Sequence, residues 1–492
     1  MNLDPTALQQ EAVHVWSGLD GRPLSPKERL SIPMQEMPAQ DPLARGKNMS
    51  EVALGYSAEQ AKIEASRCLQ CKTAPCVSGC PVSIDIPRFL NFAAQGNFTD
   101  ALGVIREASL LPAICGRVCP QESQCQAPCT LGKSLKNPLM SVAIGRVERY
   151  VADTCSDSLP PPAVKPATGK KVAVIGSGPA SMAAAADLRQ YGHAVTMFEA
   201  FHKPGGVLVY GIPEFRLPKA IVEREVNTLR QMGVDIQTNF LVGRTRKLKD
   251  LLDKDGYDAV FVGTGAGLPK FMKIDGENLV GVFSANEYLT RCNLMKAYDD
   301  GRAATPIYRS KKVAVLGGGN VAMDAARSAL RLGAQEVSVV YRRSLEEMPA
   351  RQEEVHHAQE EGIQFLTLKN AQRILGDDQG RVKAIETLTY VLGDKDASGR
   401  RSPVAVHGSE ALLEVDTVIV AIGNDSNPLL RQTTPELEVN NHGNFVVDAG
   451  GQTSMPKVWA GGDIVLGAAT VILAMGQGRK AAASIQRFLA ES

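Results

Sequence analysis

Hydrophobic residues recur along the chain with two different spacings. The change from one spacing to the other divides the chain into an N-terminal and a C-terminal part. Between residues 80 and 115 the apolar positions follow helical spacing, most clearly in 85–95 (DIPRFLNFAAQ) and 99–109 (TDALGVIREAS), which predicts a mostly helical module. From residue 170 onward, short β-branched runs alternate with Gly-rich turns and Ala-rich segments. That alternation predicts an α/β fold for the second part.

Local signals mark the ends of these parts. Ser57 is followed three residues later by Gln60, which predicts the start of a short helix that leads to Cys68. The first fifty residues are polar, contain proline and are only weakly periodic, so we expect an arm laid over other surfaces. The Pro-rich stretch 158–171 (SLPPPAVKPATGKK) predicts a semi-rigid linker that closes the N-terminal module.

One internal repeat organises the second part. The segments 170–192 (KKVAVIGSGPASMAAAADLRQYG) and 311–333 (KKVAVLGGGNVAMDAARSALRLG) align without a gap. Each contains a strand, a Gly-rich turn and a helix, which is the pattern of a Rossmann-like dinucleotide-binding unit. Two such units predict two separate nucleotide-binding domains.

Composition narrows the possible functions mainly by exclusion. The chain has 492 residues, 44% hydrophobic and 22% charged, as in a globular protein of about two to four domains. Lys and Arg number 54 against 53 Asp and Glu, which does not indicate nucleic acid or an acidic membrane surface as a partner. No signal peptide or membrane-spanning run is recognisable, so we expect a cytoplasmic protein without stable disulfides. Clustered cysteines in that setting indicate metal or redox chemistry.

Eight of the ten cysteines lie in two runs between residues 68 and 129. Three closely spaced thiolates can hold three corners of an iron–sulfur cubane, while a cysteine just before proline commonly ligates a second cluster. Cys80 and Cys119 both precede proline. The ligands predicted for the first cluster are Cys68, Cys71, Cys76 and Cys129, and those for the second are Cys80, Cys119 and Cys125.

The second cluster needs a fourth ligand, for which Cys115 and Glu148 are both candidates. Structural zinc is the alternative for the whole module, because four-cysteine zinc sites share such spacings. The two nucleotide domains that follow favour iron–sulfur clusters. Cys155 and Cys292 stand alone in the sequence and are expected to be ordinary thiols.

The first nucleotide turn favours FAD. Gly176 permits a tight turn after the strand 172–175, Gly178 lets the backbone approach a pyrophosphate, and the helix start supplies free N–H groups. After the next strand, Glu199 can accept hydrogen bonds from ribose hydroxyls and would repel a 2′-phosphate. Near the C-terminus, AGGDIVLGAAT provides Asp463 for the ribityl chain and a helix beginning at Ala469 and Thr470 to stabilise negative charge on the flavin. The predicted FAD contacts are Gly176, Gly178, Pro179, Ala180, Glu199, Gly206, Gly265, Gly462, Asp463, Ala469 and Thr470.

The second nucleotide turn favours NADP. The position that corresponds to Glu199 is Val340, and two arginines follow shortly after it. Replacing a carboxylate with guanidinium groups favours a cofactor that carries a 2′-phosphate. The predicted NADP contacts are Gly317, Gly319, Asn320, Val321, Arg342 and Arg343, of which only one arginine need touch the cofactor.

The sequence does not predict acid–base catalysis or disulfide reduction. Hydride transfer between nicotinamide and flavin needs no acid–base pair, so we predict no catalytic triad or other catalytic residue. No Cys-x-x-Cys lies near either turn, which argues against a disulfide reductase. The His356–His357 pair is expected on a solvated helix face.

The expected domains are 1–165 (arm and iron–sulfur module), 166–295 (FAD, first part), 296–424 (NADP) and 425–492 (FAD, C-terminal return).

Several motifs together carry a specific resemblance: CLQCKTAPCVSGCP, CGRVCP, GSGPA, YGIPEFRLPK, GGGNVAMDAAR, YRRS, EEMPAR and AGGDI. From about Pro42 to the end, the sequence resembles the glutamate synthase small-chain (beta subunit) family of flavo-iron–sulfur proteins. That family includes the large subunit of NADH-dependent reduced ferredoxin:NADP oxidoreductase and the N-terminal half of dihydropyrimidine dehydrogenase. The segment 263–298 is most similar to the transhydrogenase large subunits and to homo-oligomeric NADPH-dependent glutamate synthase.

The resemblance implies two [4Fe–4S] clusters with the crossed ligation given above and favours Glu148 over Cys115, since relatives carry Gln or Glu there. It also implies that FAD lies between NADPH and the nearer cluster. An FMN barrel or a glutamine-hydrolysing domain would need about 200 residues or more, and none remain unassigned. We therefore expect an oligomeric NADPH-linked electron-transfer subunit.

The implied partner is a small flavoprotein with an NAD site, with ferredoxin as a further carrier, or a large FMN-containing glutamate synthase chain. The alternative of another class is a zinc- and nucleotide-binding scaffold without turnover.

Overall fold

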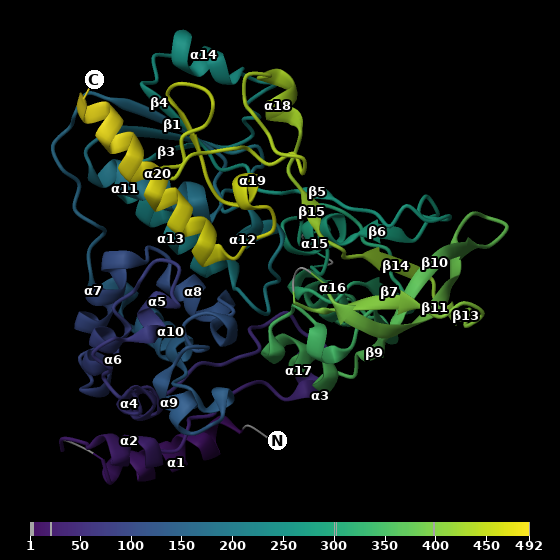
Figure 1. The fold of residues 1–492 in the computed structure, drawn as a ribbon, viewed down its shortest axis with the longest axis horizontal. Coiled ribbons are helices and arrows are strands. Elements are labelled where there is room, and N and C mark those ends of the chain that lie inside the picture. The colour runs from purple at the N-terminus through teal and green to yellow at the C-terminus, as the bar shows by residue number, and fades with distance from the viewer. Residues whose placement is uncertain (1–3, 20–21, 300, 302, 397–398, 492) are drawn as a thin grey trace.

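The computed structural model describes residues 4–19, 22–299, 301, 303–396 and 399–491. A helical module made from the N-terminal third of the chain lies against two α/β domains (Figure 1). Each α/β domain is built on a parallel sheet. This arrangement agrees with the fold class predicted from the sequence.

The helical module is mostly short helices, as the apolar spacing predicted. The Ser57 hydroxyl accepts a hydrogen bond from the Gln60 N–H at 3.2 Å, and the Gln60 side chain accepts one from the Ser57 N–H at 3.0 Å, so the predicted cap is confirmed. The elements are α4 (Ala58–Ser66), α5 (Pro75–Ser78), α6 (Ile86–Ala94), α7 (Phe98–Ala108), α8 (Pro112–Val118), η1 (Gln121–Ser123), α9 (Thr130–Ser134), η2 (Pro138–Met140), α10 (Ile144–Cys155) and η3 (Ser156–Ser158).

The N-terminal arm lies over two parts of the molecule, as expected. It contains α1 (Pro5–Ser17), α2 (Pro26–Ser31) and α3 (Pro42–Arg45). Arg29 donates to the carbonyls of Ser66 at 2.8 Å and Cys68 at 2.9 Å, which fixes the arm on the helical module. Farther along, Arg45 pairs with Glu361 at 3.0 Å, so the arm also reaches the second α/β domain.

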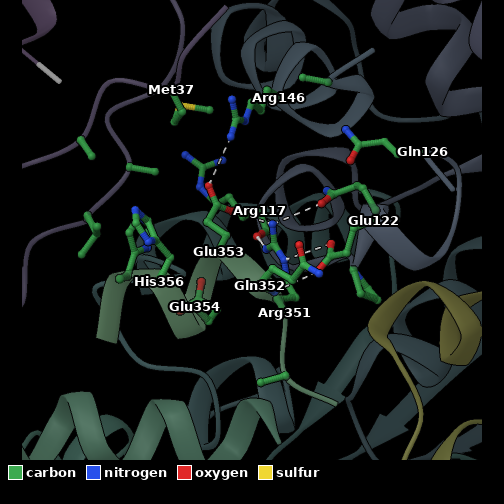
Figure 2. A pocket seen from close by; sticks show the side chains of 18 of the residues that line it. Met37, Arg117, Glu122, Gln126, Arg146, Arg351, Gln352, Glu353, Glu354 and His356 are labelled. Atoms are coloured by element: carbon green, nitrogen blue, oxygen red, sulfur yellow. Dashed lines mark hydrogen bonds and ion pairs between the residues drawn. The ribbon is translucent and has the colours of Figure 1, made fainter. Parts of the chain in front are cut away.

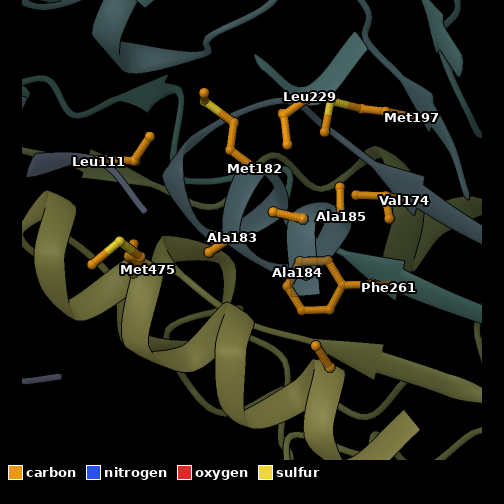
Figure 3. Close-up of a cluster of buried hydrophobic side chains, with 14 of the residues drawn as sticks. Leu111, Val174, Met182, Ala183, Ala184, Ala185, Met197, Leu229, Phe261 and Met475 are labelled. Atoms are coloured by element: carbon orange, nitrogen blue, oxygen red, sulfur yellow. The ribbon is translucent and has the colours of Figure 1, made fainter. Parts of the chain in front are cut away.

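The first α/β domain has the strand order β16-β4-β1-β2-β3. Its core lies between the sheet and the helices α11 and α20, where Val174, Ala184, Phe261 and Met475 are all buried (Figure 3). The strands are β1 (Lys171–Ile175), β2 (Ala194–Phe198), β3 (Asp235–Gln237), β4 (Ala259–Val262) and β16 (Val458–Ala460), and the helices are α11 (Pro179–Gln190), α12 (Val207–Tyr210), α13 (Lys219–Gln231), α14 (Leu248–Asp253), α18 (Leu429–Thr433), α19 (Asp463–Leu466) and α20 (Val471–Glu491). Neither α20 nor any other helix within the described ranges is long and apolar enough to cross a membrane.

The second α/β domain has the strand order β6-β14-β7-β8-β9, in which β14, β7, β8 and β9 take the places of β4, β1, β2 and β3. The outer strand differs, because β6 comes first in its domain and β16 comes last. A smaller antiparallel sheet, β10 to β13, extends from it (Figure 1). The elements are β6 (Val282–Ser284), α15 (Ala285–Asn293), β7 (Lys312–Leu316), α16 (Asn320–Arg331), β8 (Glu336–Tyr341), η4 (Leu345–Glu347), α17 (Gln352–Glu360), β9 (Gln364–Thr367), β10 (Lys369–Gly376), β11 (Val382–Lys395), β12 (Arg401–Ala405), β13 (Ala411–Glu414) and β14 (Thr417–Val420).

The chain crosses between the two domains at a short ribbon in which β5 (Leu268–Pro269) pairs with β15 (Asn424–Asp425). The expected boundary at residue 295 is therefore too late, because β6 pairs with β14 in the second sheet. The repeat located the second domain by its Gly-rich turn. The strand β6 comes before that turn and carries no such signal.

Candidate cofactor sites

The first predicted ligand set lies together in the helical module. Cys68 follows α4, Cys76 lies in α5, and Cys129 immediately precedes α9. Burial, and then negative charge on Cys68, Cys129 and Cys71, raises the pKa of Cys76 to about 12, so the four thiols are electrostatic neighbours. Cysteine thiols become thiolate ligands when iron binds and displaces their protons. The donor chemistry of this group fits an iron–sulfur cluster.

The second predicted set lines one cavity. Cys80, Cys119, Cys125, Cys115 and Glu148 all face it. Burial first, and then negative charge on Glu148 and Cys80, raises the pKa of Cys125. Cys115 is engaged in a side-chain hydrogen bond with Cys119 that raises the pKa of Cys119. Both candidates for the fourth ligand are therefore present on the cavity wall.

Glu148 has the features of an unsatisfied ligand. It projects from α10, is only 6% exposed, and burial raises its pKa to about 8. Its Oε1 atom has no hydrogen-bond partner among the described residues. A buried polar atom without a partner is costly unless something occupies the adjacent space, so this carboxyl fits a metal ligand. No three His, Cys, Asp or Glu side chains within the described ranges form a ready-made site for a metal ion.

The second thiol group lies beside the first and beside the C-terminal helix of the first α/β domain. Negative charge on Cys76 contributes to the raised pKa of Cys125, which links the two groups. The Gln124 side chain, on the wall of the same cavity, donates to the Thr470 hydroxyl at 3.3 Å. The second group therefore stands between the first group and the start of α20.

The Gly-rich turn after β1 has the shape of a pyrophosphate cradle. Gly176 has φ +93°, and a Cβ there would stand 2.5 Å from the Gly263 carbonyl. Gly206 has φ +56°, and a Cβ there would stand 2.9 Å from the Gly178 Cα. A Cβ at Gly178 or Gly265 would meet nothing within 4 Å. Gly176 makes the turn possible, Gly206 packs closely on Gly178, and Gly178 leaves open space at the start of α11, where Pro179 and Ala180 lie.

Glu199 stands where a ribose-binding carboxylate is expected. It follows the end of β2, is buried, and accepts hydrogen bonds from the Ser177 hydroxyl and, at 2.8 Å, from the Phe201 N–H. The Gly205 N–H donates in turn to the Ser177 hydroxyl at 2.8 Å. Sequence reasoning missed Ser177, whose position inside the glycine turn was the only available signal.

The C-terminal segment completes the wall of this site. Gly462 has φ +80° and donates its N–H to the Gln477 side chain at 2.7 Å. Asp463 begins α19, and burial raises its pKa to about 6. Its carboxylate accepts the Ala469 N–H at 3.2 Å. The following helix α20 begins at Val471, slightly later than expected, because Thr470 acts as a cap whose hydroxyl accepts the Leu473 N–H at 3.3 Å.

The second nucleotide turn repeats the geometry of the first. Gly317 has φ +143°, and a Cβ there would stand 2.3 Å from the Ala421 carbonyl. A Cβ at Gly319 would meet open space. Asn320 then begins α16, and the Val321 side chain is 41% exposed beside the turn. The start of α16 can therefore receive a phosphate group.

The two arginines after β8 have different environments. Arg343 is buried, donates to the Arg401 carbonyl at 2.8 Å and pairs with Asp396 at 2.6 Å. Arg342 is exposed and has no hydrogen-bond or ion-pair partner among the described residues. Arg342 is therefore available to a 2′-phosphate, while Arg343 holds the antiparallel sheet against the domain.

The prediction that both histidines of α17 are solvated is wrong for one of them. His356 is exposed, whereas His357 is buried, and burial lowers the pKa of His357 to about 4. Consecutive helical positions lie about 100° apart and cannot share a face. His357 falls on the face of α17 that packs inward, with the buried Glu354 and Ala358. Cys155 and Cys292 are also buried, each outside the two thiol groups.

A cavity of about 1140 Å³ lies where the arm, the helical module and α17 meet. Arg351 stands on its wall and contacts Glu353 at 2.7 Å (Figure 2). It also donates to the Gln121 side chain at 3.2 Å. Arg146 faces Glu353 from the opposite side at 3.8 Å. Sequence reasoning did not find this junction, because its residues come from segments more than two hundred positions apart.

Comparison with known proteins gives two family matches and several relatives that match over most of this chain. Residues 170–478 match the pyridine nucleotide-disulphide oxidoreductase family, and residues 45–158 match the family described as dihydropyrimidine dehydrogenase domain II, 4Fe-4S cluster. The glutamate synthase [NADPH] small chain of Azospirillum brasilense is 38% identical over 92% of this chain and 94% of its own. The NADP(+)-dependent formate dehydrogenase subunit beta of Moorella thermoacetica is 39% identical over 85% of this chain and 60% of its own.

A solved structure supports the fold of the nucleotide domains. FprA of Mycobacterium tuberculosis in complex with NADPH matches 66% of this chain and 85% of its own, with a TM-score of 0.56 and 20% identity. The match to a 4Fe-4S family favours iron–sulfur clusters over structural zinc in the helical module.

Proposed function

Since the chain belongs to the family of glutamate synthase small chains and related NADPH-linked beta subunits, we propose that it carries electrons from NADPH through FAD and two [4Fe–4S] clusters to a partner protein. The observation that carries this proposal is the row of sites described above. The start of α20, which forms part of the wall of the FAD site, adjoins the second thiol group, and the second group adjoins the first. Electron transfer along such a row needs short steps and no acid–base catalyst.

Different residues would hold FAD and NADPH. FAD would be held by the cradle at Gly176 and Gly178, by Glu199, and by Asp463 with the segment before α20. NADPH would lie on the turn Gly317–Gly319, with Arg342 at its 2′-phosphate. Bound FAD supplies the conversion between hydride chemistry and single-electron transfer. The protein's part is to place the two nucleotides and to exclude water.

The cluster ligands proposed here are the two thiol groups. Cys68, Cys71, Cys76 and Cys129 hold the first cluster, while Cys80, Cys119, Cys125 and Glu148 hold the second. The unpaired Oε1 of Glu148 supports this choice. Cys115 is already engaged with Cys119, which makes it the weaker candidate.

The partner is proposed to be a separate electron-transfer subunit. The match over 94% of a glutamate synthase small chain supports a large FMN-containing chain. The resemblance of residues 263–298 to transhydrogenase subunits supports a small flavoprotein with an NAD site. Anaerobic affinity purification from native cells distinguishes them: a co-eluting chain of more than a thousand residues selects the first, and a small flavoprotein selects the second.

The surface over the first thiol group is suited to an acidic partner. Cys71 and Cys76 are only half-buried, and exposed lysines at 72, 133 and 136 lie in the segments that carry the ligands. The segments 69–79 and 127–140 contain no Asp or Glu. A basic surface next to a redox centre attracts and orients a partner with acidic groups.

The proposal is tested on protein purified without oxygen. Addition of NADPH should bleach the flavin absorbance and then produce electron paramagnetic resonance signals of two reduced [4Fe–4S] clusters. Protein that contains neither iron nor acid-labile sulfide after reconstitution would contradict it.

Replacing Lys72, Lys133 and Lys136 with Glu should slow electron transfer to the partner about tenfold at low salt, without slowing flavin reduction. Lys383→Glu, an exposed change on β11, is the control.

A further inference from the structure

Arg351 joins the NADP turn to the second cluster site. It is the residue before α17, and it is 7% exposed. Its backbone N–H donates to the Asn320 side chain at 2.9 Å, and Asn320 is the first residue of α16 after the turn. The preceding Ala350 N–H donates to the Gly318 carbonyl at 3.3 Å. The backbone of residues 350–351 is therefore attached to the nucleotide turn at two points.

The Arg351 side chain extends into the helical module. Its guanidinium donates to the Arg117 carbonyl at 2.5 Å and to the Gln121 side-chain oxygen at 3.2 Å. Glu122 lies 3.9 Å from the Arg351 Nε atom, and its carboxylate accepts the Gln352 N–H at 3.2 Å. Figure 2 shows this group of contacts at the junction. Residues 230 positions apart in sequence are thus in direct contact.

Gln121 is the link to the second cluster site. It is buried, and its side chain borders both the large junction cavity and the cavity lined by Cys115, Cys119 and Glu148. Its amide N–H groups donate to the carbonyls of Cys115 and Gly116 at 3.4 Å. The side chain rests on Gly145, where a Cβ would stand 2.1 Å from the Gln121 nitrogen. Gln121 therefore has little freedom to move independently of the residues that line the cluster cavity.

We propose that Arg351 is a positioning residue through which nucleotide binding at the NADP turn and the redox state of the second cluster influence each other. This inference rests on the proposed function, since it requires the second cluster. Reduction potentials of iron–sulfur clusters depend on nearby hydrogen bonds and charge. Reduction adds negative charge beside Gln121, which attracts the guanidinium and opposes binding of an anionic nucleotide at the turn held by the same residue.

Linkage makes this influence reciprocal. If the reduced protein binds the nucleotide more weakly, the bound nucleotide must make the cluster harder to reduce by the same factor. If Arg351 had a purely structural role, replacing it would change the stability of the protein. It would not make nucleotide affinity depend on the redox state of the cluster. The discriminating quantity is therefore the ratio of nucleotide affinities for the oxidised and the reduced protein.

The experiment uses 2′-phospho-ADP-ribose, the part of NADP without nicotinamide, so that no hydride is transferred. Its dissociation constant is measured anaerobically by calorimetry with oxidised and dithionite-reduced holoprotein. The reduced wild-type protein should bind it about fivefold or more weakly, and the nucleotide should alter the electron paramagnetic resonance signal of one cluster only. In Arg351→Met and in Gln121→Leu the ratio should fall to about one. Arg373→Met, on the exposed strand β10, should keep the wild-type ratio.

The outcomes separate this inference from the proposed function. A wild-type protein with two clusters and a ratio of one overturns the role of Arg351 and leaves electron transfer intact. A wild-type ratio that persists in an Arg351→Met protein with both clusters also overturns it. If the Arg351→Met protein loses a cluster, the role of Arg351 is decided by two other measurements. These are the affinity ratio of Gln121→Leu and the effect of the nucleotide on the electron paramagnetic resonance signals of the wild-type protein. A wild-type protein without iron–sulfur clusters overturns the proposed function itself.

Discussion

Arg216 and Asp324 form a buried ion pair between the two nucleotide domains, with Nη1 of the arginine 2.7 Å from Oδ1 and 2.8 Å from Oδ2 of the aspartate. Arg216 follows α12 in the first domain, and Asp324 lies on α16 in the second. Arg216 also pairs with Glu354 of α17 at 3.1 Å, and Glu354 pairs with Arg327. The two domains are therefore joined by a group of charges that are almost wholly removed from water.

Removing Arg216 should destabilise the protein strongly. Arg216→Met leaves Asp324 without its ion-pair partner in a buried site and leaves Glu354 with Arg327 alone, a loss of about 3–5 kcal/mol for such broken pairs. At about 2–4 °C per kcal/mol for a large domain, the thermal unfolding midpoint should fall by about 6 °C or more. Arg373→Met breaks an exposed pair with Glu386 and should lower the midpoint by no more than about 3 °C. Equal shifts in the two variants would contradict the difference in burial.

His357 should make stability depend on pH below neutrality. Burial, and then Arg327, lowers the pKa of His357 from 6.5 to about 4. The unfolded chain takes up this proton below about pH 6.5 while the folded protein does not, so stability is present above that pH and declines as the pH falls. Between pH 8 and 5.5 the loss from this residue should be about 1 kcal/mol.

Denaturant titrations of His357→Gln at several pH values measure that contribution as a shallower slope than in the wild type. His356→Gln, which changes the exposed neighbour, is the matched control and should keep the wild-type slope. An unchanged slope in His357→Gln would mean that this imidazole is not the group responsible.

Arg342 should determine the preference for NADPH. Arg342→Gln removes a charge-assisted contact of about 1.5–3 kcal/mol, so the dissociation constant of NADPH should rise about tenfold or more. That of NADH should change by less than about threefold, because NADH lacks the phosphate. Arg343→Gln should lower the thermal midpoint, since it breaks the ion pair with Asp396, yet retain the selectivity. Fluorescence titration with both nucleotides provides the measurement, and equal weakening of both by Arg342→Gln would remove Arg342 from phosphate recognition.

Glu148 should be required for one cluster only. Glu148→Ala should halve the iron and sulfide content and remove one of the two electron paramagnetic resonance signals, since a ligand of the second cluster is lost. Cys115→Ala is the matched control on the same cavity wall and should retain both signals. The opposite result for this pair of variants would assign the ligand to Cys115.

The features that the sequence predicts well are those with a local physical cause. Gly176 and Gly317 are required by positive φ angles and by backbone carbonyls that a Cβ would approach to within 2.5 Å, so the turns are visible in the sequence alone. The order of the cysteines similarly indicates which thiols group together. Glu199 lies after the strand where the repeat predicts it.

The features that the sequence does not predict depend on long-range packing. The burial of His357 follows from how α17 packs in its domain. Arg343 is not available to a nucleotide because it binds Asp396 and the Arg401 carbonyl of the antiparallel sheet. The strand β6 lacks a turn motif and joins its sheet only through β14. The contact between Arg351 and Gln121 requires two modules to be assembled.

The pairing of Arg45 with Glu361 has a consequence for biosynthesis. These residues are 316 positions apart, so Glu361 must be synthesised before the Arg45 segment can form this pair. Until then the segment that includes Arg45 lacks this partner. Contacts of such long range close late and slowly. Attachment of the Arg45 segment, unlike that of the part held by Arg29, is therefore expected to be among the last steps of maturation.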